Sequence, residues 1–169
     1  MKAGAITALT AILLGSGLSP ASAQWYAKPD SAGAIVVTAV MKTADNVALL
    51  SYITCAGNGL KWTFETNSVA TDAGSIKPSA VSISIPRADP AFKLDLSASA
   101  VSMPGGALAL ESKLSSDQSR QLLRQLQAGR KIDATIAGNS FESDDIHLTI
   151  SGQFASSVAL ALPQACKLN

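Results

Sequence analysis

The chain has 169 residues, with 13 lysines and arginines against 12 aspartates and glutamates and a formal net charge of +1. This near balance argues against a protein that binds nucleic acid through generic positive charge, because non-specific affinity for polyanions requires clustered cationic side chains. The length suits one ordinary domain with a sizeable core, and no linker or internal repeat divides it.

The first 23 residues have the layout of a cleavable secretory signal peptide. Lys2 precedes an apolar run that continues through Leu14, and the segment ends in the small-residue sequence ASA. Glycines interrupt the apolar run and no stop-transfer sequence follows it, so we expect cleavage before Gln24 rather than a retained membrane anchor. The sequence therefore predicts a single mature domain of residues 24–169 that is periplasmic or secreted and is not stably inserted in a membrane.

Two segments open the expected domain. Residues 24–32 form a mixed entry segment whose aromatic side chains, Trp25 and Tyr26, can pin the N-terminus. Residues 33–41, with the sequence GAIVVTAVM, are apolar and rich in β-branched side chains, which predicts a buried strand.

The chain is organised around a predicted β-hairpin at residues 47–64. One strand carries Cys55 into the turn sequence AGNG, and the next strand carries Trp62. Apolar and polar residues alternate after the turn, so Trp62 is expected in the core; the alternative is an exposed platform that stacks on a sugar or a base. In an exported chain with two cysteines, Cys55 and Cys166 are expected to form one disulfide that closes the domain. The alternative is an intermolecular bridge or a redox pair, although no Cys-x-x-Cys motif supports the redox pair.

The middle of the chain continues with short strands. Polar, turn-rich residues 66–78 lead into the alternating segment 81–85, and residues 92–96 repeat the alternation after a turn. These two segments are expected to be hairpin neighbours. Residues 101–103 and 107–110 flank a Pro-Gly-Gly turn, with a strand on at least one side.

A capped helix interrupts this β pattern. Ser115 and Gln118 have the spacing of a capping box, in which each side chain bonds to the backbone of the other residue. The apolar face that follows and the stop at Gly129 predict a helix over residues 116–128. Arg120 and Arg124 are four residues apart and share one face of this helix, where they could meet an acidic partner or an anionic surface; a solvated helix face is the alternative.

Residues 131–137 and 146–150 return to strand alternation, and residues 154–162 are expected to form a short apolar helix that ends at Pro163. Many short strands with two short helices late in the chain predict a mainly β domain, either a β-sandwich or a barrel-like fold.

The sequence offers little material for chemistry. His147 lies at an outward-facing strand position, no Gly-x-Ser-x-Gly motif accompanies it, and the conventional ligands are too few for zinc. Four oxygen-bearing side chains crowd one loop without the spacing of a calcium-binding EF-hand, so a polar hairpin loop explains them more simply: Asn139, Glu142, Asp144 and Asp145. We therefore predict no catalytic residue, no metal and no cofactor.

A strand that ends at Cys55, an N-terminal Trp25 and the late sequences LLRQLQAG, KIDATIAG and IHLTISGQFASSVALALPQAC give the chain a family likeness. In these features it resembles the invasion-associated locus B-like family of small exported bacterial proteins, mainly over the last third of the chain. The resemblance implies an all-β, sandwich-like exported protein without a catalytic constellation and with a role at the envelope or in host interaction. It transfers no functional residue.

The leading hypothesis is a non-enzymatic module, exported by a Gram-negative bacterium, that binds another protein or an envelope component through its β surface. The alternative is a small secreted hydrolase or carbohydrate-binding protein that uses Trp25, Tyr26 or Trp62.

Overall fold

The computed structural model describes residues 25–69, 73–88, 91–138, 144–152, 155–166 and 168. The predicted signal peptide, residues 1–23, lies outside the described residues. The elements in chain order are β1 (Trp25–Pro29), β2 (Ile35–Thr43), β3 (Ala48–Ala56), β4 (Gly59–Val69), the 3-10 helix η1 (Ala73–Ser75), β5 (Ser79–Ile85), β6 (Phe92–Ser102), β7 (Ala107–Leu114), α1 (Ser116–Gln127), β8 (Ile132–Ile136), β9 (Ile146–Ile150) and α2 (Ala155–Ala165).

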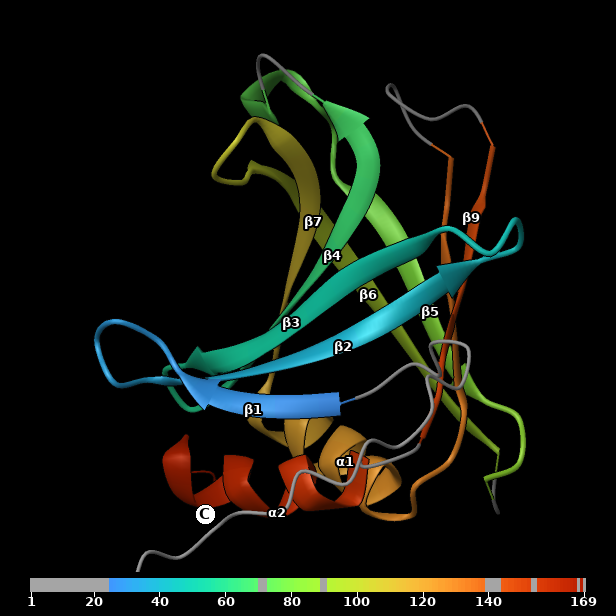
Figure 1. The fold of residues 1–169 in the computed structure, drawn as a ribbon. Helices are drawn as coiled ribbons and strands as arrows, with labels where there is room; N and C mark the ends of the chain where they lie inside the picture. The colour runs from blue at the N-terminus through green and yellow to red at the C-terminus, as the bar shows by residue number, and fades with distance from the viewer. Residues whose placement is uncertain are drawn as a thin grey trace, which may run out of the picture.

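The strands form one antiparallel sheet that closes on itself. Its order is β1-β2-β3-β4-β7-β6-β5-β8-β9, and β2 pairs with β9 as well as with β1. One edge of β2 is long enough for both neighbours, because Ile35–Ala39 faces β1 and Met41–Thr43 faces β9. The mainly β class is thus confirmed, and the β2–β9 pairing makes the fold a closed barrel with β1 as an extra strand (Figure 1), not the sandwich that was also considered.

The expected hairpins are present. β3 and β4 pair across the turn at Gly57, with Ile53 opposite Trp62 and Cys55 opposite Leu60. Gly57 has a positive φ of 61°, which a glycine adopts without steric cost. β5 pairs with β6, as the alternating segments predicted. β6 also pairs with β7 across the Pro-Gly-Gly turn, where a strand was expected on at least one side.

The barrel interior is filled by side chains from the inward face of each strand. Trp62 and Phe64 on β4 are fully buried and stack with their ring centroids 4.9 Å apart. Ser51 on β3 and Ser112 on β7 face the same interior, because they lie opposite Phe64 and Trp62 in the strand registers. The prediction that Trp62 belongs to the core is therefore confirmed.

The two helices lie together across one end of the barrel (Figure 1). The structure confirms the predicted helix α1, which turns Leu122, Leu123 and Leu126 into the core. α2 contributes Ala155, Ala159 and Leu162 to the same core.

Three expectations need correction. Residues 24–32 are more than an entry segment, because Trp25–Pro29 forms β1; the aromatic pin itself is present, since the Trp25 indole N–H donates to the Ser151 carbonyl at 2.6 Å. Residues 66–78 are not all turn, because β4 continues to Val69 and the Thr66 hydroxyl donates to the Leu108 carbonyl at 2.9 Å. Pro163 does not end the last helix but lies inside α2, and the first residue of the expected segment, 154, is outside the described residues.

Candidate functional site

The disulfide between Cys55 and Cys166 anchors the end of α2 to the central hairpin. The two Cα atoms are 5.0 Å apart although 111 residues separate them in sequence, which confirms the predicted pairing. Cys166 is buried, whereas Cys55 is partly exposed where β3 ends. The covalent link therefore holds the end of α2 against the end of β3.

Hydrogen bonds cap the N-terminus of α1 and join it to β4. The Ser115 hydroxyl accepts from the Gln118 backbone N–H at 3.2 Å, and the Gln118 side chain accepts from the Ser115 backbone N–H at 2.9 Å, which completes the predicted capping box. The Ser119 hydroxyl donates to the Ser115 carbonyl at 2.7 Å and accepts from the Leu60 backbone N–H at 2.9 Å. A buried helix serine therefore bonds α1 directly to the barrel wall.

The close approach of β4 to the end of β7 depends on Gly59. A Cβ atom at this position would lie 2.2 Å from the Leu114 carbonyl oxygen, a distance that real Cβ atoms do not reach. Glycine is thus required because the backbones of β4 and β7 nearly touch beside the start of the helix.

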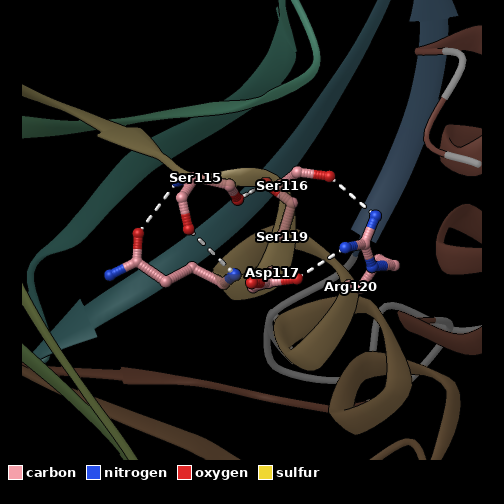
Figure 2. Close-up of polar contacts among 6 residues, drawn as sticks. Ser115, Ser116, Asp117, Ser119 and Arg120 are labelled. Atoms are coloured by element: carbon pink, nitrogen blue, oxygen red, sulfur yellow. Dashed lines mark hydrogen bonds and ion pairs between the residues drawn. The ribbon is translucent and has the colours of Figure 1, made fainter.

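The two arginines of α1 are placed differently. Arg120 reaches back along the helix, where one guanidinium nitrogen donates to the Ser116 hydroxyl at 2.7 Å and another pairs with the Asp117 carboxylate at 2.5 Å (Figure 2). Asp117 therefore offsets part of the charge of Arg120. Arg124 is exposed one turn later and has no ion pair or hydrogen bond within the described part of the chain.

Both arginines border a groove between α1 and the end of α2. Its volume is about 370 Å³, and its lining consists of Arg120, Leu123, Arg124, Gln127, Pro163 and Leu168. Leu123 and Leu168 are almost fully buried, so they form an apolar floor beneath two cationic side chains. Sequence reasoning found the arginines, but it missed the rest of the groove because no local pattern places Leu168 beside α1.

His147 lies elsewhere, on the outer face of β9. Its side chain is exposed, as predicted, and its Nδ1 atom is 3.2 Å from the Thr135 hydroxyl. In a Ser-His-Asp arrangement this ring nitrogen faces a carboxylate instead. The hydroxyl partner gives His147 a cross-strand structural contact and no orienting acid.

A shallow hollow of about 290 Å³ does place His147 near the carboxylates of Asp45, Asp144 and Asp145. Asp145 is occupied structurally, because it accepts from the Gly138 backbone N–H at 2.9 Å. Asn139 and Glu142, which the loop hypothesis also included, lie outside the described residues. Among the residues that are described, no group of three side chains has the arrangement of a metal site.

The aromatic side chains offer one exposed ring near the N-terminus. Trp62 and Trp25 are buried, while the Tyr26 side chain is 43% exposed. Of the three aromatics considered for sugar binding, Tyr26 alone has an accessible face.

In the part of the chain that the structure describes, no helix has the length and apolar character needed to cross a membrane.

A further polar contact on the barrel wall has no signal in the sequence. The Tyr52 hydroxyl donates to Glu65 at 2.6 Å, and the other oxygen of Glu65 accepts from the Leu50 backbone N–H at 3.3 Å. Burial and this contact with Glu65 raise the pKa of Tyr52 above its ordinary value. The contact joins β3 to β4 where the pairing of β4 with β7 shifts its register.

Comparison with known proteins gives one structural likeness. No family model matches the sequence, and no functionally curated protein matches it. The fold is similar to the crystal structure of invasion associated protein b from Bartonella henselae, with 13% sequence identity and a TM-score of 0.48, over 88% of this chain and 99% of that chain.

Proposed function

We propose that the protein is an exported, non-enzymatic binding module that recognises an acidic segment of another protein or of an envelope component. The observation that carries this proposal is the groove between α1 and α2, where Arg120 and Arg124 flank the apolar side chains of Leu123 and Leu168.

The chemistry of the groove suits a partner that is both acidic and apolar. Arg124 has a free guanidinium group among the described residues, and such a group binds a carboxylate through two parallel hydrogen bonds. An apolar side chain next to that carboxylate would cover Leu123 and Leu168 and exclude water. Burial of this kind strengthens the ionic contact because the local dielectric constant falls.

Export is supported by two independent features. The leader sequence has the layout of a signal peptide, and the Cys55–Cys166 disulfide is of a kind that persists in oxidising compartments. A periplasmic or secreted location, in a Gram-negative bacterium, is part of the proposal.

Two observations favour the alternative function, a small secreted hydrolase or a carbohydrate-binding protein. His147 shares a hollow with three carboxylates, and Tyr26 has an accessible ring. This alternative predicts that His147→Ala or Tyr26→Ala abolishes a measurable hydrolytic or sugar-binding activity, whereas the binding-module proposal predicts that both variants capture the partner normally.

The test uses the mature, disulfide-bonded protein as bait in envelope extract. Wild type, the Arg120→Glu/Arg124→Glu variant and a control Lys28→Glu variant are compared; Lys28 is exposed on β1 and does not line the groove. The proposal expects a partner that the wild type and the control recover and that the groove variant loses. Equal recovery by all three proteins would remove the groove from the binding function.

A further inference from the structure

A second hollow lies where the turn after β5 meets the connection from α1 to β8. Its volume is about 460 Å³, and its lining consists of Pro86, Arg87, Gly129, Arg130, Lys131 and Asp133. Arg130 and Lys131 follow directly after Gly129, where the helical segment ends. None of the lining residues belongs to the groove between α1 and α2.

Strand pairing brings the basic residues of this hollow together. β5 and β8 are antiparallel neighbours, with Ser84 opposite Asp133. Arg87 follows the end of β5 and Arg130 precedes the start of β8, so both emerge at the same end of two adjacent strands. The register thus sets two arginines, far apart in sequence, on the rim of one hollow.

The backbone that leads to Arg130 packs closely against a neighbouring segment of the chain. Gly129 ends the helical segment with a φ of 63°. Its carbonyl oxygen would lie 2.1 Å from a Cβ atom added at Gly152, so the two backbones are in close contact. The backbone between α1 and β8 therefore packs directly on the backbone that follows β9.

The charges of the hollow do not balance. Lys131 pairs with Asp133 at 2.8 Å, and Asp133 also accepts from the Thr149 hydroxyl at 3.3 Å. Arg87 and Arg130 have no ion pair or hydrogen bond within the described residues. Three cations and one carboxylate line the hollow, an excess of two positive charges. Arg87 and Arg130 lie just outside β5 and β8, and like charges that border one hollow repel each other unless an anion lies between them.

We propose that this hollow binds a phosphate group in its dianionic form. A dianion offsets the excess of two positive charges, whereas a single carboxylate would leave one arginine uncompensated. Guanidinium groups also match phosphate oxygens with paired hydrogen bonds. The phosphate belongs either to a soluble phosphate compound or to a lipid headgroup. This site is separate from the groove and does not depend on its function.

The test measures inorganic phosphate binding to the mature protein by calorimetry at low ionic strength. The hollow variant, Arg87→Gln/Arg130→Gln, is compared with the matched variant Arg120→Gln/Arg124→Gln, which removes the same number of charges from the groove. We expect at least about tenfold weaker phosphate binding in the hollow variant and a change below about twofold in the groove variant, because contacts to a bound anion are local.

A second measurement separates binding from folding. Phosphate should raise the melting temperature of the wild type and of the groove variant, because a ligand of the native state stabilises it, and should leave that of the hollow variant unchanged. Sedimentation with phosphatidylcholine vesicles, prepared with or without phosphatidic acid, distinguishes the two sources of phosphate. Sedimentation that requires phosphatidic acid indicates a lipid headgroup. Phosphate binding without such sedimentation indicates a soluble phosphate compound. The proposal is overturned if millimolar phosphate does not bind saturably, or if both double variants lose binding equally.

Discussion

Removal of the disulfide tests the claim that one covalent link closes the domain. The link joins residues that are 111 positions apart, so its loss lets the unfolded chain sample many more conformations. In the chain-entropy model a loop of this length corresponds to about 4 to 5 kcal/mol of stability. The native state of a Cys55→Ala/Cys166→Ala variant should persist, because Ala159 and Leu162 still anchor α2 in the core.

The assays are denaturant unfolding and thermal unfolding of the mature protein and of the double variant, each with and without reductant. We expect the variant to lose about 4 to 5 kcal/mol of unfolding free energy and roughly 10 to 15 °C in melting temperature. Reductant should bring the wild type to the stability of the variant and should leave the variant unchanged. A loss below about 1 kcal/mol, well under the entropic estimate, would refute the reasoning.

Two further predictions concern single side chains. Ser119→Ala should cost about 1 to 3 kcal/mol, because it leaves the Leu60 N–H without its acceptor, whereas Ser112→Ala should cost under about 0.5 kcal/mol or stabilise, since its buried hydroxyl has no partner among the described residues. Equal losses in denaturant unfolding would contradict this difference. The raised pKa of Tyr52 means that the native state keeps a proton which the unfolded chain releases above about pH 10, so this contribution to stability is present below that pH and declines above it. Tyr52→Phe should therefore flatten the alkaline fall in unfolding free energy; an unchanged slope would show that its contact with Glu65 does not govern the fall.

Much of the local structure could be predicted because its signals are local. The alternation of apolar and polar residues identified β5 and the start of β6, and the turn residues between β3 and β4 identified the central hairpin. The capping box of α1 is specified by two side chains three residues apart, and the structure shows both of its hydrogen bonds. The predicted export signal, residues 1–23, and the partner role of Arg120 and Arg124 stay predictions.

Other features had no local signal. β1 is short and mostly exposed, so no buried alternation marked it as a strand. Polar residues at the end of β4 hid this part of the strand in the sequence pattern. Thr66 is buried there with its hydroxyl donating a hydrogen bond to the Leu108 carbonyl, on a strand distant in sequence. These elements exist because of partners that a linear pattern does not reveal.

The sequence by itself determined the mainly β class, the central hairpin, the capped helix and the disulfide pairing, since each depends on residue type, short spacing or the number of cysteines. Only the tertiary structure decided that the sheet closes through β2 and β9, that the end of α2 completes a groove with Arg124, and that Arg87 and Arg130 share one hollow. The physical reason is that strand register and helix docking are set by contacts between residues remote in sequence, whose free energies become available when the whole chain packs.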